Sequence, residues 1–158
     1  MKVEYINPFI ESVYDLFSTM LSSKATRGDV GVFRQGPNPR DIMALIGLSG
    51  HARGMVALSF PSATAINMVN RLLDMDTKVI DDTVSDGIAE LVNIVAGAAK
   101  AKFPADDGSP IDLSLPTVVR GNSYNVDYPS GTVWLEVPFD SDIGSFSLRV
   151  TFSFDDKK

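Results

Sequence analysis

The order of segments along the chain is the feature that most limits how it can fold. Segments that alternate apolar and polar residues, or that are rich in β-branched residues, fall into two blocks, with two helical segments between them. A further helical segment precedes the first block. No strand–helix–strand unit repeats, so the sequence predicts an α+β fold in which helices pack on a mainly antiparallel sheet.

The expected elements can be placed by their patterns and flanking residues. Asn7 is expected to cap the first helix, because its side chain can accept a hydrogen bond from a following amide, and Pro8 suits the first helical position. Ser62 opens the second helix, in which four residues are expected to face inward: Ile66, Val69, Leu72 and Leu73. Strands are expected within residues 29–36, 41–50, 54–61, 114–121, 131–139 and 144–154, with a hairpin turn at 129–131.

Composition excludes several classes of protein. The 158 residues are expected to form one domain, residues 1–158, large enough to bury a core. A net charge of −6 argues against nucleic acid or an anionic membrane as the main partner. The absence of cysteine excludes disulfides, thiol catalysis and thiolate metal sites. No apolar run or signal-peptide pattern predicts membrane insertion or export, so a cytoplasmic location is expected.

The third helical segment carries the pattern of most interest. It is expected to be capped by Asp81 or Asp82 and to run from near Val84 to about Lys102. At about 100° of rotation per residue, one side of this helix is apolar. The residues of that apolar side are Val84, Ile88, Leu91, Val95 and Ala99.

The opposite side of this helix combines two polar groups with small residues. Glu90 and Asn93 lie within about 60° of each other on an ideal helix, at the centre of the outward stripe. Their neighbours there are expected to be small: Ala89, Ala96 and Gly97. A solvated helix surface normally carries long side chains, and an interior glycine costs roughly 1 kcal/mol relative to alanine. The stripe is therefore interpreted as a flat docking surface from which two polar groups project.

Several interpretations of these residues remain open at this point. Glu90 and Asn93 are also compatible with an ordinary solvated face, and Gly97 with close packing by a strand. No nucleophile accompanies the pair, which argues against covalent catalysis by these residues. An amide can hold a water molecule and a carboxylate can bind a partner's cation, so the pair is suited to positioning. Water orientation by an amide side chain is used in phosphoryl transfer.

The spacing of four residues carries a resemblance to a known family. Asp86, Glu90, Asn93 and Pro116 match the pattern D/S-x3-E-x2-N-x22-P. The surrounding stretches NPFIESV, IGLSG, ELVNIVAGAAK and LSLPTVVRG agree as well. Over roughly residues 3–152, the sequence resembles the CheX branch of the CheC/CheX/FliY family of response-regulator phosphatases. The motif occurs once, as in CheX, so the resemblance implies a CheC/CheX-like fold with one site.

The resemblance also implies a function and a division of roles. Proteins of this family dephosphorylate the phospho-aspartate of CheY-like receiver domains. Asn93 would orient the attacking water, and Glu90 would pair with the receiver's active-site lysine. The receiver would supply the acyl phosphate and Mg²⁺, so no cofactor or metal of this chain's own is expected. Asp86 and Gly97 are weaker candidates for partner contact, Asp86 being equally suited to favour the helix dipole.

The resemblance also implies self-association and leaves one alternative function open. The chain is expected to form a homodimer through its sheet, since an exposed strand edge otherwise invites uncontrolled pairing. The alternative to a phosphatase is a non-catalytic module of the same fold that binds a receiver or a flagellar switch component.

Overall fold

The computed structural model describes residues 6–33, 41–50, 52–103, 111–121 and 133–154. Its helices are α1 (Asn7–Met20), α2 (Ser62–Leu73) and α3 (Asp82–Lys102). Its strands are β1 (Ala25–Arg27), β2 (Gly31–Phe33), β3 (Ile42–Gly50), β4 (Ala52–Phe60), β5 (Ile111–Leu113), β6 (Thr117–Arg120), β7 (Trp134–Ser141) and β8 (Phe146–Phe154). In the described part of the chain, no helix is long and apolar enough to cross a membrane.

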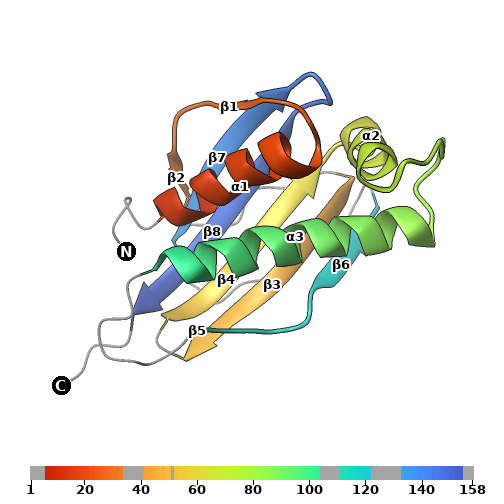
Figure 1. The fold of residues 1–158 in the computed structure, drawn as a ribbon. Coiled ribbons are helices and arrows are strands. Elements are labelled where there is room, and N and C mark those ends of the chain that lie inside the picture. Colours follow the sequence, from red (N-terminus) through yellow and green to blue (C-terminus); the bar gives the residue numbers. More distant parts are fainter. Residues whose placement is uncertain (1–5, 34–40, 51, 104–110, 122–132, 155–158) are drawn as a thin grey trace.

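The strands form one sheet whose neighbours are antiparallel. Its order is β1-β7-β8-β4-β3-β5, with β2 also paired to β7 and β6 also paired to β3. The helices lie across one face of this sheet, with α1 over β7 and β8 and α3 crossing β4 and β3 (Figure 1). The α+β prediction is therefore confirmed, and so is the mainly antiparallel sheet.

The main core lies between the helices and the sheet. Alternate residues of the central strands point toward the helices, and Ile46 of β3 pairs with Val56 of β4 on that face, both at most 1% exposed. The intervening residues point to the opposite face, where Met43, Leu45 and Ala57 form a second, smaller buried cluster. On that same opposite face Arg149 donates from Nε to Glu136 Oε2 at 2.6 Å, which pairs a buried cation with a carboxylate of the adjacent strand.

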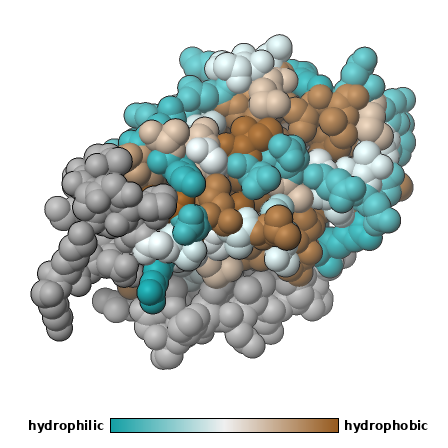
Figure 2. Space-filling view, turned by 60° about the horizontal axis from the view of Figure 1, so that its bottom comes forward, coloured by the Kyte–Doolittle hydropathy of each residue, from teal (hydrophilic) through white to brown (hydrophobic). Residues whose placement is uncertain are grey.

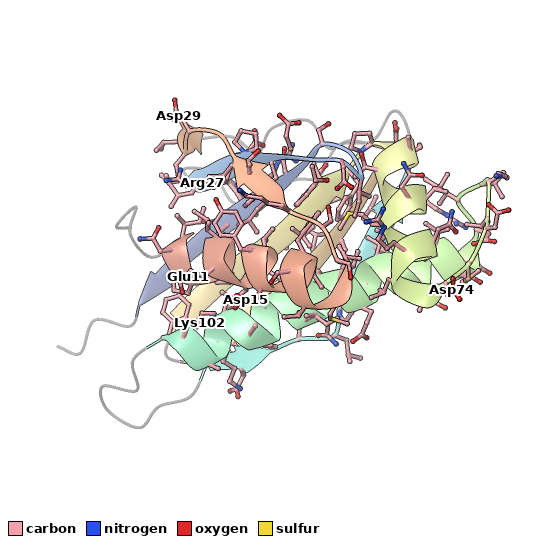
Figure 3. The ribbon with its side chains drawn as sticks, turned by 45° about the horizontal axis from the view of Figure 1, so that its top comes forward. Glu11, Asp15, Arg27, Asp29, Asp74 and Lys102 are labelled. Carbon is pink, nitrogen blue, oxygen red and sulfur yellow. The ribbon has the colours of Figure 1, made fainter. Side chains whose placement is uncertain are left out.

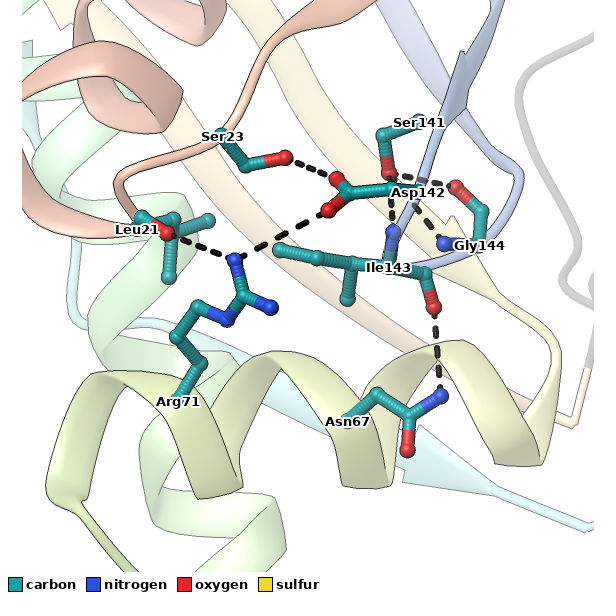
Figure 4. A network of polar contacts seen from close by, with 8 residues as sticks. All are labelled: Leu21, Ser23, Asn67, Arg71, Ser141, Asp142, Ile143 and Gly144. Atoms are coloured by element: carbon teal, nitrogen blue, oxygen red, sulfur yellow. Dashed lines mark hydrogen bonds and ion pairs between the residues drawn. The ribbon is translucent and has the colours of Figure 1, made fainter.

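Polar contacts fasten the helices to one another and to the β7–β8 turn. Arg71 of α2 donates to the backbone oxygen of Leu21 at 3.1 Å and lies 3.9 Å from Asp142 of the turn (Figure 4). Asn67 of the same helix donates to the oxygen of Ile143 at 3.2 Å. At the other end of the layer, Lys102 of α3 pairs with Asp15 of α1 at 3.2 Å (Figure 3). The helices are thus joined to the sheet at the β7–β8 turn and to one another at the other end of the layer.

Some expected details differ in the structure. Asn7 is the first residue of α1 and does not cap it; Ile6 occupies the capping position, and no side chain makes a capping hydrogen bond there. Leu73 was expected to face inward but is 47% exposed, because α2 ends at this residue and its last turn extends beyond the core. β1 and β5, of three residues each, were not predicted. The expected turn at 129–131 lies outside the described residues.

Candidate functional site

The third helix is built as the sequence predicts, from its cap to its buried side. The Asp81 side chain accepts a hydrogen bond from the backbone amide of Val84 at 3.0 Å and caps the helix. Asp82 in the first turn and two lysines in the last turn complement the helix dipole. The five residues predicted to face inward are all 0% exposed: Val84, Ile88, Leu91, Val95 and Ala99. This burial fixes which side of α3 faces solvent.

The candidate site residues lie on the solvent side of α3. Asp86, Glu90 and Asn93 are all exposed, as expected. Glu90 and Asn93 make no hydrogen bond or ion pair with any described residue, so both side chains are available to a partner. Successive turns of one rigid helix carry them, which holds their spacing fixed. Among the described residues, no three His, Cys, Asp or Glu side chains are grouped to hold a metal ion.

The small residues around the pair divide into two kinds. A Cβ added at Gly97 would meet nothing within 4 Å, which excludes close packing against this glycine and leaves open space beside Asn93. Ala96 was expected on the same outward stripe, but it is only 1% exposed and belongs to the core. Its side of α3 faces the chain segment that leads into β6, as shown below. The exposed surface of α3 is therefore narrower than predicted. It forms a ridge that consists of Asp86, Glu90, Asn93 and Gly97.

A second segment of the chain runs beside this ridge. Arg120, at the end of β6, donates to Ser85 Oγ at 3.2 Å and lies 3.4 Å from Asp82 Oδ1, which ties β6 to the first turns of α3. Pro116 precedes β6 and is half-buried, consistent with a role in shaping the segment. Leu115, which the sequence did not single out, is 88% exposed. An isolated leucine in a loop carries no periodic signal, so pattern reasoning had no means of finding it.

A hollow elsewhere on the surface contains none of the candidate residues. It has a volume of about 680 Å³ and lies between α1 and β1, lined by residues that include Tyr14, Lys24 and Arg27. The candidate site, in contrast, is an exposed helix surface. A carboxylate and an amide on an open ridge cannot enclose a small substrate. Such a ridge is suited to entering a site on another macromolecule.

Comparison with known proteins agrees with this geometry. Residues 42–140 match the model of the family described as "Chemotaxis phosphatase CheX". The match covers more than half of the chain, from β3 through α3 to β7, and so includes the whole ridge. The chain belongs to the CheX family.

Individual relatives resemble the chain over most of its length. The CheY-P phosphatase CheX of Thermotoga maritima is 28% identical over 127 residues, which are 80% of this chain and 81% of that protein. A CheC-like superfamily protein from Shewanella sp. PV-4 has a TM-score of 0.85 at 28% identity, covering 97% of this chain and 99% of that one. CheX in a CheX–CheY–BeF3–Mg²⁺ complex from Borrelia burgdorferi shares the fold, with a TM-score of 0.79 at 21% identity over 96% and 99% of the two chains.

Proposed function

We propose that this chain dephosphorylates the phospho-aspartate of a CheY-like receiver domain. The observation that carries the proposal is the exposed Glu90–Asn93 pair, which makes no polar contact with a described residue, on a helix of a CheX-family fold. The Thermotoga relative is named a CheY-P phosphatase, and the Borrelia protein of this fold is complexed with CheY. These names support a receiver domain as the partner.

The reaction assigns a distinct role to each member of the pair. Asn93 holds a water molecule through one donor and one acceptor of its amide, in line with the bond from phosphorus to the aspartyl oxygen. Water oxygen bonds to phosphorus as that bond breaks, which gives inorganic phosphate and restores the aspartate carboxylate. Glu90 pairs with the receiver's active-site lysine and so fixes the helix against the receiver. The receiver supplies the acyl phosphate and the Mg²⁺, and this chain contributes no metal.

The energy required of one amide is modest. A hundredfold acceleration corresponds to about 2.7 kcal/mol of barrier. Holding a reactant in a near-attack position can supply several kcal/mol in principle. Asn93 needs no nucleophilic chemistry to achieve this, because its contribution is the placement of the water molecule.

Substitution of Asn93 tests the proposal. Each receiver domain from the same genome would be phosphorylated with acetyl phosphate and Mg²⁺, and phosphate release would be followed with the wild type and with Asn93→Ala. We expect the wild type to accelerate release from at least one receiver, and Asn93→Ala to bind that receiver but lose nearly all acceleration. Asn7→Ala is the matched control, because Asn7 is an exposed helical asparagine on α1 that makes no capping bond.

The alternative function is a non-catalytic module that binds a receiver or a flagellar switch component. It predicts equal phosphate release with the wild type and Asn93→Ala. The presence of both Glu90 and Asn93 at family spacing favours the phosphatase, since binding alone would not require an amide aimed away from the core.

A further inference from the structure

The segment between β5 and β6 is held firmly to the sheet. The Ser114 amide donates to the oxygen of Gly47 at 3.0 Å, and its hydroxyl accepts from the Gly47 amide at 2.8 Å. The same hydroxyl donates to the oxygen of Leu115 at 3.0 Å. On the other side Pro116 restricts the backbone of Leu115 to extended conformations. The position of Leu115 is therefore set by its neighbours on both sides.

The side chain of Leu115 nevertheless lies in solvent. At 88% exposed it is the most exposed large apolar residue among those the structure describes. Single exposed leucines are common on protein surfaces and by themselves indicate nothing. What distinguishes this one is a fixed backbone beneath it and its position relative to α3.

The geometry places the segment that carries Leu115 along α3, because the strands on both sides of it contact this helix. Leu115 precedes by five positions Arg120, which contacts α3 at Asp82 and Ser85. Five extended residues span roughly 16 Å, and the same length of helix holds about 11 residues. β5 and β6 both contact α3, and the segment between them runs antiparallel to the helix (Figure 1). At full extension this length of chain brings Leu115 to about the level of residues 93–96.

The angular positions of residues around the axis of α3 agree with this placement. Ser85, Ala89 and Ala96 lie within about 40° of one another around α3, and Ser85 contacts Arg120, so this side faces the segment. The burial of Ala96 is accounted for in the same way. Asn93 lies about 40–80° further round toward solvent. The side of the molecule on which the segment lies shows apolar surface interspersed with hydrophilic surface (Figure 2).

We infer that Leu115 is a specificity-determining anchor, which packs against an apolar patch bordering the phosphorylation site of the receiver domain. The inference rests on the proposed function, since it extends the Glu90–Asn93 surface to a neighbouring segment. Asp86 and Glu90 give the ridge a negative charge, which suits a basic partner face such as one that carries a lysine. An apolar contact at the edge of such a face selects among basic partners and slows dissociation.

The inference predicts that KM and kcat respond separately to substitution of Leu115. The experiment uses the receiver that the wild type dephosphorylates, and measures kcat and KM for phosphate release as well as Kd for that receiver with beryllium fluoride and Mg²⁺. Leu115→Ala is expected to raise KM and Kd about tenfold while kcat stays within about twofold, because the side chain contacts the partner but not the phosphoryl group. Leu115→Met is expected to restore nearly wild-type KM. Val32 is an exposed apolar residue on β2, which pairs with β7 near the opposite edge of the sheet from β6. Val32→Ala is the control and should change neither KM nor kcat.

Two results would overturn the inference, and they can be told apart. Wild-type KM and Kd in Leu115→Ala would refute the anchor while leaving the proposed function intact. A wild-type chain that neither binds nor dephosphorylates any receiver would refute the proposed function and the inference with it. Leu115→Ala with lowered kcat and unchanged KM would also refute the anchor, since that pattern belongs to a group acting on the reaction itself.

Discussion

At the scale of residues, the separation of three positions between Glu90 and Asn93 gives the site its geometry. This spacing puts a charged group and an amide on adjacent turns of the same face, so one docking event can place both. Neither side chain makes a hydrogen bond with a residue that the structure describes. Substitutions distinguish a docking surface from an ordinary solvated helix face of the same exposure.

Replacement of Glu90 tests its role as an anchor. Glu90→Gln keeps the size of the side chain but removes its charge, so we expect KM for the phosphorylated receiver to rise several-fold, with a smaller fall in kcat. The difference in KM between Glu90→Gln and the wild type should be smaller at high salt, because added ions screen the attraction that Glu90 makes in the wild type. Steady-state kinetics at two ionic strengths would measure both effects.

The control for this substitution lies on another helix. Glu11 is exposed on α1 (Figure 3), and Glu11→Gln removes the same charge away from the ridge. An equal rise in KM for the two variants would mean that only the overall charge of the protein matters, and Glu90 would lose its assigned role.

The two kinds of site residue differ in how well sequence predicts them. The exposure of Glu90 and Asn93 could be predicted, because helical periodicity shows which residues face solvent once the apolar side of the helix is known. The side of α3 on which Ala96 lies was predicted wrongly because this residue is at the boundary between the two sides, where burial in the main core depends on tertiary packing. Leu115 depends likewise on tertiary contacts, made through Ser114 and Gly47, that have no local signature.

At the scale of elements, α3 contains two glycines with opposite surroundings. A Cβ at Gly97 would meet nothing within 4 Å, whereas a Cβ at Gly87 would lie 2.7 Å and 2.9 Å from the two Cγ atoms of Val69 on α2. Gly87 thus permits α2 and α3 to approach each other, and Gly97 serves no such purpose. A helix that keeps a glycine at an open position forgoes stability there.

Alanine at these two positions should change stability in opposite directions. We expect Gly97→Ala to raise the free energy of unfolding by about 0.5–1 kcal/mol, because alanine restricts the unfolded chain and favours helix. Gly87→Ala should lower it by about 1–2 kcal/mol, because overpacking against Val69 outweighs the same gain. Urea denaturation of both variants measures the difference, and a loss of stability in Gly97→Ala would show that the space beside it is filled.

Partner binding then distinguishes open surface from docking surface at Gly97. Gly97→Leu should fold, yet weaken binding of the receiver, because its side chain would occupy the clearance that we assign to the partner's backbone. Binding as tight as that of the wild type would place Gly97 outside the interface.

Element boundaries were predicted well where long patterns exist and poorly where they do not. The 21 residues of α3 and the nine of β3 give several periods each. Three-residue strands such as β1 hold little more than one period of alternation and gain their identity only by pairing with β7. Asn7 failed as a cap because α1 begins one residue earlier than its Asn-Pro signal suggests.

At the scale of the whole molecule, one face of the sheet carries the helices and the ridge, and the other carries a smaller apolar cluster. Prediction of the fold class required only the order of helical and extended segments. The pairing order β1-β7-β8-β4-β3-β5 could not be read from that order, because it places the strands of the last block between those of the first. Such long-range pairing is decided by the packing of the complete chain. That the chain is a single domain stays a prediction.

The resemblance to CheX further predicts self-association, and we propose a homodimer joined through the sheet. This arrangement leaves the ridge on α3 free for a receiver, since the helices and the opposite face of the sheet are separate surfaces (Figure 1). Sedimentation equilibrium over a range of concentrations should return twice the mass of one chain. A single-chain mass at micromolar concentration would contradict the proposal.

The central claim is that Asn93 acts on the chemical step and not on binding. Single-turnover dephosphorylation of a receiver at saturating concentrations of this chain measures that step directly, with Kd determined in parallel. The account predicts that Asn93→Ala leaves Kd within a few-fold of the wild-type value and lowers the rate constant at least a hundredfold, to near the receiver's own rate. A rate constant equal to that of the wild type, or a loss of rate fully explained by a weaker Kd, would contradict it.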